Sequence, residues 1–162
     1  MIAVVQERPP LIRAMRQADV GAVAELEQYT YDFPWNEGIF RDCLLAGYLN
    51  VVLDCGGEVV GYGIMSVAAG EAHLLNICVA ESLRRQGIGR NLLQYLLRRA
   101  RTLRAQRMFL EVRPSNEVAI AMYRAFGFEV LGVREHYYKA HGGSEDAVVL
   151  VRHFGDDEDR AD

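Results

Sequence analysis

The sequence predicts a single α/β (α+β) domain, in which a mixed sheet carries helices on both faces. The chain has 162 residues, of which 51% are hydrophobic and 25% are charged, a length and composition that suit one domain with its own core. Segments with strand-like and helix-like patterns alternate along it, and strands dominate both ends. We find no internal repeat and no low-complexity segment.

The composition separates the two ends of the chain from this domain. Residues 1–10 are expected to form a flexible or strand-adding arm, and residues 155–162 an acidic tail without apolar residues to bury. The domain itself is expected over residues 11–154. The tail carries the whole formal charge of -4, so the rest of the chain is close to neutral. A neutral body gives no overall electrostatic reason to bind DNA or an anionic membrane.

The sequence also favours a cytoplasmic protein without a metal. The first residues reach charged and proline positions too early for a signal peptide, and no apolar run approaches the roughly 20 residues that span a bilayer. The three cysteines, Cys43, Cys55 and Cys78, are widely spaced and odd in number, which favours reduced thiols. No CxxC pair or histidine spacing typical of a metal site occurs, so we predict no metal.

The N-terminal part of the domain predicts one strand and two helices. Residues 11–15 form the first expected strand, and Asp19 is expected to cap a helix that carries apolar residues over 20–27. The Phe33-Pro34-Trp35 break then separates this helix from a second one at 36–45.

The next segments predict a hairpin and a third strand beside it. Residues 50–55 and 58–67 read as its two strands, joined by Gly56-Gly57, because glycine adopts the positive φ angles of tight turns. Residues 72–79 are expected to join the same sheet.

The second half of the domain predicts two helices and three strands. Leucines recur at helical spacing over 92–103, with arginines turned elsewhere, and residues 108–112 read as a buried strand. Ser115 or Asn116 is expected to cap a helix that ends at Gly127. Strands follow over 128–133 and 147–151, separated by a loop with Tyr137, Tyr138 and the Gly142-Gly143 turn.

The loop Arg84-Arg85-Gln86-Gly87-Ile88-Gly89-Arg90, between a strand and a long helix, is a candidate anion site. Glycines let the backbone approach a ligand, and a helix N-terminus offers unpaired N–H groups. The neighbouring arginines add positive charge and further hydrogen-bond donors for an anion. An ordinary tight turn explains the glycines equally well. The loop lacks the Gly-Lys-Ser/Thr ending of a nucleoside-triphosphate loop and the third glycine of a dinucleotide fingerprint.

Three further residues have two interpretations each. Glu111 lies inside a buried strand, where partial burial is expected to raise its pKa and suit it as a general base; alternatively it pairs with Arg113 or a helix arginine. Tyr123 is either a core aromatic residue or a proton donor, since a phenol with a pKa of about 10 is protonated at neutral pH. Asn116 is either a helix cap or a cofactor ligand.

Together these motifs resemble the GCN5-related N-acetyltransferase (GNAT) superfamily, whose fold has a mostly antiparallel sheet. Within it, the chain from about residue 11 to 153 is similar to the bacterial ribosomal-protein-alanine N-acetyltransferases. That narrower resemblance rests on Phe33-Pro34-Trp35-Asn36, residues 71–77, Leu110-Glu111-Val112-Arg113, Ala121-Met122-Tyr123, Gly127-Phe128, Tyr137-Tyr138 and Glu145-Asp146-Ala147. Pro114 departs from the alanine that is frequent there, and the arm and tail lie outside the match.

The resemblance implies an acetyl-CoA-dependent enzyme that acetylates the N-terminal alanine of a small-subunit ribosomal protein, with a transient ribosome contact. It makes Glu111 the proton acceptor and Tyr123 the proton donor. Tyr137 and Tyr138 would then overhang the acceptor groove and contact the peptide, or else simply pack. The residues that it assigns to acetyl-CoA are Ile77, Cys78, Val79, Arg85, Gln86, Gly87, Ile88, Gly89, Arg90 and Asn116.

Other functions remain open at this point. A relative of the same superfamily would acetylate a lysine side chain or a small-molecule amine. A non-catalytic acyl-CoA-binding module, or an arginine-rich helix that docks on ribosomal RNA, would use the same sequence differently. Cys78 would be a nucleophile in a covalent mechanism, although no histidine forms a recognisable pairing motif with it.

Overall fold

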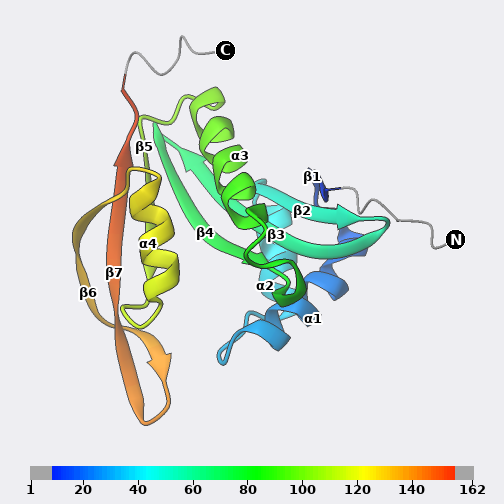
Figure 1. The fold of residues 1–162 in the computed structure, drawn as a ribbon, viewed down its shortest axis with the longest axis horizontal. Coiled ribbons are helices and arrows are strands. Elements are labelled where there is room, and N and C mark those ends of the chain that lie inside the picture. The colour runs from blue at the N-terminus through cyan, green and yellow to red at the C-terminus, as the bar shows by residue number, and fades with distance from the viewer. Residues whose placement is uncertain (1–8, 156–162) are drawn as a thin grey trace, which may run out of the picture.

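The computed structural model describes residues 9–155, which form one seven-stranded sheet flanked by four helices (Figure 1). The strand order is β1-β2-β3-β4-β5-β7-β6, and every neighbouring pair is antiparallel except β4 with β5. The predicted mixed, mostly antiparallel sheet is therefore confirmed. The expected arm and tail lie outside the described residues, apart from 9–10 and 155.

The elements follow the predicted order. The strands are β1 (Leu11–Ala14), β2 (Leu49–Cys55), β3 (Glu58–Ala68), β4 (Glu71–Val79), β5 (Arg107–Val112), β6 (Glu129–Ala140) and β7 (Gly143–His153). The helices are α1 (Val20–Thr30), α2 (Glu37–Leu45), α3 (Ile88–Thr102) and α4 (Glu117–Ala125), with short 3-10 turns at Gln17–Asp19 and Glu81–Leu83. Within the described residues, no helix is long and apolar enough to cross a membrane.

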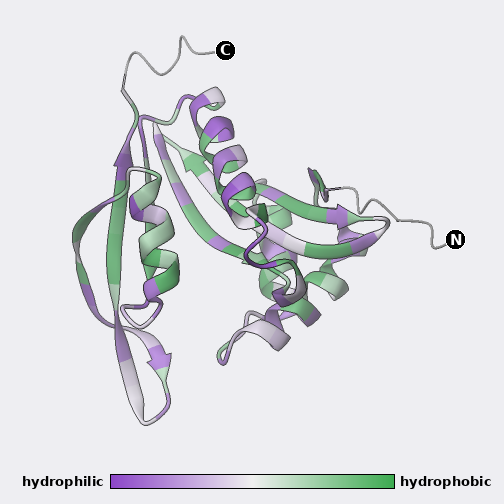
Figure 2. Cartoon of the chain, in the orientation of Figure 1, coloured by the Kyte–Doolittle hydropathy of each residue, from purple (hydrophilic) through white to green (hydrophobic). Residues whose placement is uncertain are grey.

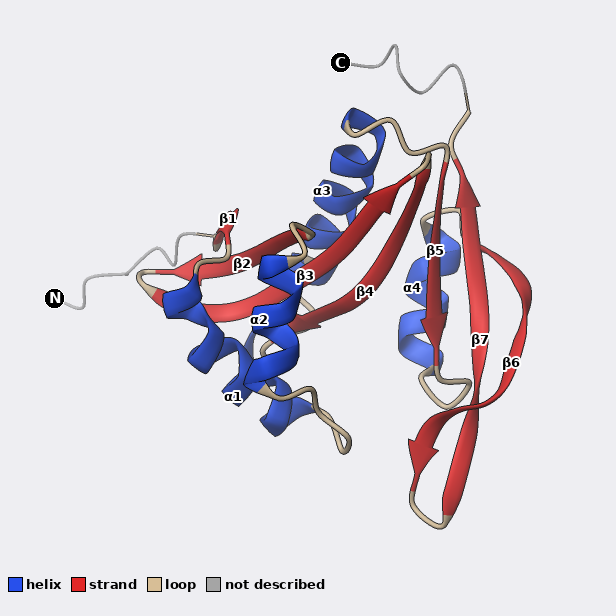
Figure 3. Ribbon diagram, turned by 180° about the vertical axis from the view of Figure 1, so that it is seen from behind, coloured by secondary structure: helices blue, strands red, loops and turns tan. Residues whose placement is uncertain are grey.

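Helices cover both faces of the sheet, as the sequence predicts (Figures 1 and 3). On one face, the leucines of α3 pack with Met65, Met108 and Leu150 of the strands, and Tyr123 of α4 joins the same core. On the other face, α1 and α2 bury Val23 and Phe40 against strand residues such as Tyr62. The α3 leucines at positions 92, 93, 96 and 97 are almost fully buried, because their spacing places them on one side of the helix.

The sheet divides between β4 and β5, which separate in a V that is visible in Figure 1. These parallel strands pair only from Glu71 to His73 on β4 and from Arg107 to Phe109 on β5. Beyond this point each strand continues without the other, so the end of β4 and residues Leu110 to Val112 of β5 face a gap between the two halves of the sheet. The candidate site lies at this divergence.

Two predicted features need correction. Asp19 precedes α1, but its side chain does not cap that helix: it accepts hydrogen bonds from the Arg13 guanidinium and from the Arg16 backbone N–H, at 2.7 and 2.8 Å. The ion pair with Arg13, which also binds Asp54, competes for the carboxylate that the cap would need. A 3-10 turn between Arg16 and α1 results.

The last two strands are much longer than predicted. β6 pairs with β7 from Glu129 to Ala140, with irregularities after Val130 and between Arg134 and Tyr138. Tyr137 and Tyr138 therefore belong to a strand rather than to a loop. β6 is an edge strand whose side chains are mostly exposed on both faces. It therefore lacks the apolar alternation by which a strand is recognised in sequence.

Gly61 of β3 supports a packing prediction. A Cβ there would lie 2.7 Å from both the Cys78 carbonyl oxygen and Leu53 Cδ1. Gly61→Ala is therefore expected to destabilise the protein by about 1–3 kcal/mol, because β3 and β4 would have to move apart. Urea unfolding measures the loss. Gly132→Ala is the matched control, since nothing lies within 4 Å of its Cβ, and it should stay within about 0.5 kcal/mol of the parent. Equal effects at both positions would contradict the close approach.

Candidate active site

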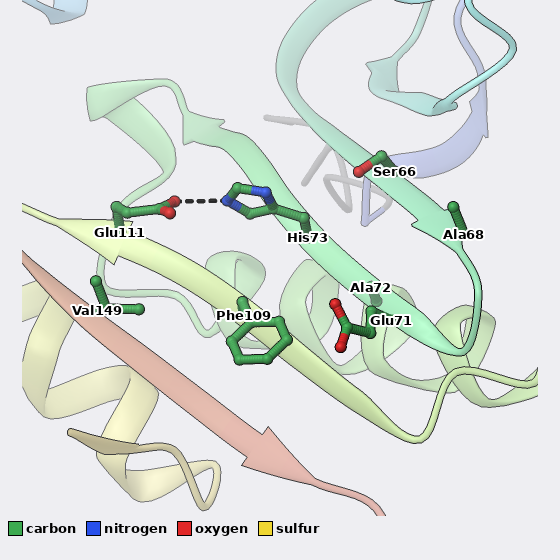
Figure 4. A pocket seen from close by; sticks show the side chains of 8 residues that line it. All are labelled: Ser66, Ala68, Glu71, Ala72, His73, Phe109, Glu111 and Val149. Atoms are coloured by element: carbon green, nitrogen blue, oxygen red, sulfur yellow. Dashed lines mark hydrogen bonds and ion pairs between the residues drawn. The ribbon is translucent and has the colours of Figure 1, made fainter. Parts of the chain in front are cut away.

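Glu111 projects from β5 just beyond the point where β4 and β5 separate (Figure 4). Its Oε2 lies 2.5 Å from Nε2 of His73 on β4, and its Oε1 lies 3.4 Å from Nη1 of Arg134 on β6. Only 11% of the Glu111 side chain is exposed, against 35% for His73. A largely buried carboxylate is thus held between a histidine and an arginine from two other strands.

The environment of Glu111 changes its pKa in the direction opposite to the sequence prediction. Burial by itself would raise the pKa, but the hydrogen bond and charge of His73, together with Arg134, hold it below its ordinary value. Glu111 is therefore ionised at neutral pH, and Nε2 of His73 must donate its proton to the carboxylate. The expected pairing with Arg113 or a helix arginine is wrong as well, because Arg113 pairs with Glu145 at 3.1 Å.

His73 and Arg134 are the residues that sequence reasoning missed. They lie 38 and 23 positions from Glu111 in the chain, so no local motif connects them. The parallel register, in which His73 stands opposite Phe109, is what brings His73 within reach of Glu111. Arg134 also lies over the ring of Tyr137, with its guanidinium carbon 4.5 Å from the ring centre.

Tyr123 lies on α4 and is 6% exposed, packed edge-on against Phe128 with ring centres 5.6 Å apart. Burial raises its pKa to about 12, so the phenol keeps its proton throughout the neutral range. Among residues 9–155 the hydroxyl has no hydrogen-bond partner, so no direct hydrogen bond joins it to Glu111. Tyr123 therefore carries an available proton on α4, whereas the His73–Glu111 pair lies on strands β4 and β5.

The N-terminus of α3, which follows the glycine loop, has no side-chain cap. Gly87 is the N-cap residue at φ 76°, a left-handed conformation that favours glycine, and no side chain caps the helix. The first turn holds no acidic residue, and a Cβ on Gly87 would meet nothing within 4 Å. The N–H groups of Ile88, Gly89 and Arg90 have no partners within the helix, because its first internal bond is donated by Asn91. This geometry fits a diphosphate.

The strand before this loop contributes Ile77, Cys78 and Val79. The Ile77 carbonyl accepts a hydrogen bond from the Tyr31 hydroxyl at 2.9 Å, and the Val79 carbonyl accepts one from Arg84 Nε at 3.2 Å. Cys78 is 5% exposed, and burial raises the pKa of its thiol. A buried, protonated thiol is a poor nucleophile, which argues against the covalent alternative. The cysteines are all free thiols.

Asn116 is the N-cap of α4, and its side-chain oxygen accepts a hydrogen bond from the Ala119 N–H at 3.2 Å. The capping interpretation is therefore confirmed. Its amide nitrogen stays available to a ligand. The interpretation as a cofactor ligand remains a prediction.

Two hollows lie in this half of the molecule, and Glu111 lines the first of them. The first, of about 380 Å³, lies on the open sheet face and is lined by both members of the His73–Glu111 pair together with Ser66, Ala68, Glu71, Ala72, Phe109 and Val149 (Figure 4). The second, of about 400 Å³, lies between the segment after α1 and the β6–β7 hairpin, and is lined by Asp32, Phe33, Pro34, Arg113, Tyr137, Tyr138 and Lys139.

The aromatic residues of the second hollow are held by arginine. The Arg113 guanidinium lies 4.4 Å from the ring centre of Tyr138 and 5.7 Å from that of Phe33. Tyr137 and Tyr138 pack edge to face, and Arg134 joins Tyr137 to Glu111. Arg134 thus connects a residue of this hollow to the Glu111 carboxylate. Within the described part of the chain, no group of three or more potential metal ligands occurs.

Comparisons with known proteins identify the family of the chain. Residues 12–128 match the model of the Acetyltransferase (GNAT) family. The chain is 36% identical over 140 residues to the [ribosomal protein bS18]-alanine N-acetyltransferase of Escherichia coli strain K12, covering 86% of this chain and 95% of that protein. It is 32% identical over 143 residues to a putative enzyme of the same name from Bacillus subtilis, covering 86% and 92%.

Solved structures show the same similarity. The crystal structure of the ribosomal-protein-S18-alanine N-acetyltransferase from Escherichia coli superposes with a TM-score of 0.83 at 34% identity, covering 90% of this chain and 96% of the other. Ard1 from Thermoplasma volcanium superposes with a TM-score of 0.82 at 25% identity, covering 92% and 100%.

Proposed function

Because the chain belongs to the Acetyltransferase (GNAT) family and is an N-acetyltransferase, we propose that it acetylates the N-terminal alanine of a small-subunit ribosomal protein, with acetyl-CoA as donor. Relatives that are 36% and 32% identical over most of the chain carry names for this activity. The observation that carries the proposal is the largely buried, ionised Glu111 at the divergence of β4 and β5, which Arg134 links to Tyr137 in the second hollow.

The donor's diphosphate fits the N-terminus of α3. Gly87 leaves room for close approach, the N–H groups of Ile88 to Arg90 are unpaired, and Arg85 and Arg90 add positive charge. We assign Ile77 to Val79 of β4 to the acyl and pantetheine end, because the separated strand leaves one of its edges without a partner strand. A backbone N–H there would polarise the thioester carbonyl. The side-chain amide nitrogen of Asn116 would donate a hydrogen bond to acetyl-CoA.

Glu111 and Tyr123 then carry out the two proton transfers of the reaction. A neutral amine attacks the thioester carbon, the Glu111 carboxylate accepts the amine proton, and Tyr123 gives its proton to the thiolate of coenzyme A as the C–S bond breaks. His73 and Arg134 orient Glu111 and keep it ionised. No acyl-enzyme forms.

The lowered pKa of Glu111 favours an α-amine as the acceptor. A carboxylate with a pKa below its ordinary value is a weak base. At pH about 7.5, roughly a quarter of an N-terminal amine with a pKa near 8 is already neutral, against about one lysine in a thousand at a pKa near 10.4. A weak base is therefore sufficient for an N-terminus, whereas a lysine would require a stronger one.

A peptide panel tests the acceptor. A peptide that copies an alanine-initiated ribosomal protein should gain one acetyl group at its N-terminus, detected by mass spectrometry, whereas a lysine peptide with a blocked N-terminus should not. The opposite result would assign the enzyme to side-chain amines.

The pH dependence gives a second expectation for the same reaction. For the alanine peptide, kcat/KM should rise with pH up to about 8 and then level off, because the acceptor amine becomes neutral near that pH. Tyr123, the proton donor, causes no fall in kcat/KM over this pH range, since its pKa is about 12. A rate that keeps rising toward pH about 10 would instead indicate a lysine-like acceptor.

A further inference from the structure

Glu27 of α1 is a buried carboxylate that the proposed proton transfers do not use. Only 3% of the residue is exposed, and it faces the core between the α1–α2 layer and the sheet, where the residues of β2 and β3 are mostly hydrophobic (Figure 2). Among residues 9–155 it forms no ion pair. Burial raises the pKa of its carboxyl group above the ordinary value. Because an apolar residue would fill the same space at lower cost, packing alone does not account for a glutamate here.

Three groups from three other segments act as hydrogen-bond donors toward the Glu27 carboxylate. The Tyr62 hydroxyl of β3 lies 2.6 Å from Oε2. Nδ2 of Asn76, on β4, lies 3.1 Å from Oε1 and 2.9 Å from Oε2. The backbone N–H of Trp35, between α1 and α2, also favours the ionised form. Glu27 therefore joins α1 to β3, to β4 and to the segment before α2 at one point.

Asn76 lies at an irregular point of β4. Two successive residues of β3 pair with Asn76 and Leu74. Leu75, between them, has no partner and forms a bulge. Adjacent side chains of a regular strand point to opposite faces, but Leu75 packs with the core beneath α1 and Asn76 binds Glu27 on that same side. The hydrogen bond to Glu27 thus holds the residue at which β4 changes direction.

The end of α1 also contacts the two residues of β4 that follow Asn76. The Tyr31 hydroxyl donates a hydrogen bond to the Ile77 carbonyl at 2.9 Å, and the Cys78 sulfur lies 3.6 Å from Thr30 Oγ1. α1 therefore contacts three successive residues of β4. The last two of these belong to the segment that we assign to the acyl and pantetheine end of acetyl-CoA.

We propose that Glu27 is a positioning residue for acetyl transfer, which acts through Asn76 to fix the bulge of β4 and the direction of the backbone at 77–79. This role rests on the proposed use of acetyl-CoA, but not on the identity of the acceptor. Residues 32–34, which follow α1, line the second hollow, so the same contacts hold the donor segment and this hollow in one arrangement. A displacement of about 1 Å in such a site can lower the rate by about 10²-fold.

Glu27→Gln tests this role. Glutamine keeps the volume of the side chain, but it replaces one of the two oxygens near Asn76 Nδ2 by an NH2 group that cannot accept a hydrogen bond. We expect kcat to fall by about 10- to 10²-fold with the amine that the unaltered enzyme acetylates. Calorimetric titration should give a Kd for coenzyme A within about twofold of the parent, because the diphosphate is assigned to α3.

Infrared spectroscopy of bound acetyl-CoA, isotope-labelled at the acetyl carbonyl, gives a readout that needs no acceptor. In the unaltered enzyme the carbonyl stretch should lie below that of free acetyl-CoA, because a backbone N–H polarises the C=O bond. In Glu27→Gln at least half of this shift should be lost. The two proposals can therefore fail separately: an alanine peptide that is not acetylated would contradict the proposed acceptor, whereas an unchanged carbonyl stretch in Glu27→Gln would overturn the role of Glu27.

Asn76→Ala and the double variant locate the effect. If Glu27 acts through Asn76, Asn76→Ala should lower kcat by a similar factor, and the double variant should lose no more than either single variant. Asp19→Asn is the matched control, since Asp19 is also a buried carboxylate, 7% exposed, at the other end of α1. It should lower the stability in urea unfolding but keep kcat within about twofold. Losses that multiply in the double variant, or an equal loss of kcat in Asp19→Asn, would overturn the proposal.

Discussion

Replacing Glu111 by glutamine is expected to lower kcat by about 10²- to 10⁴-fold, the usual contribution of a general base, while acetyl-CoA binding stays within about twofold. Glutamine preserves the shape of the side chain and can still accept a hydrogen bond from His73, but its amide oxygen cannot hold the amine proton. Steady-state kinetics with the alanine peptide gives kcat, and calorimetric titration gives the acetyl-CoA affinity.

Glu71→Gln is the matched control for this variant. Glu71 lines the same hollow as Glu111, but it is 48% exposed and pairs with Arg107 at the far end, before the strands diverge. Its loss should leave kcat within about twofold, since an exposed pair contributes little. A Glu111→Gln enzyme that keeps more than about a tenth of its kcat would show that another group takes the proton.

The parts of the fold that the sequence predicts well are those with strong local signals. The Phe33-Pro34-Trp35 break precedes α2 as predicted, and the Gly56-Gly57 turn joins β2 to β3. The buried leucines of α3 follow a helical repeat. Each of these signals depends on residues within a few positions, so tertiary contacts do not override it.

The features that sequence reasoning misses depend on contacts between distant segments. Asp19 reads as a helix cap until Arg13 takes its carboxylate, and β6 is hard to detect because an exposed edge strand has no apolar alternation. In the site, Glu111 could be identified from its motif, but the direction of its pKa could not. That direction depends on His73 and Arg134, which arrive through strand register rather than through spacing along the chain.

Tyr123 presents the converse case, because its packing alone gives no reason for its hydroxyl. The ring is buried in the core with Phe128, yet the hydroxyl has no hydrogen-bond partner in the described part of the chain. A phenylalanine would fill the same space and would lose no hydrogen bond within residues 9–155. The hydroxyl therefore contributes little to folding, whereas its proton, held with a pKa of about 12, is available to a leaving thiolate at neutral pH.

Tyr123→Phe is accordingly expected to reduce kcat by about 10²-fold while the free energy of unfolding changes by less than about 1 kcal/mol. This loss of kcat lies at the low end of the range for removal of a general acid, because a thiol with a pKa near 8.5 already leaves fairly well as a thiolate. Kinetics and urea unfolding measure the two quantities. Tyr95→Phe, on α3 against the same core, should change neither. A Tyr123→Phe enzyme with undiminished kcat would assign Tyr123 to packing and leave the proton to solvent.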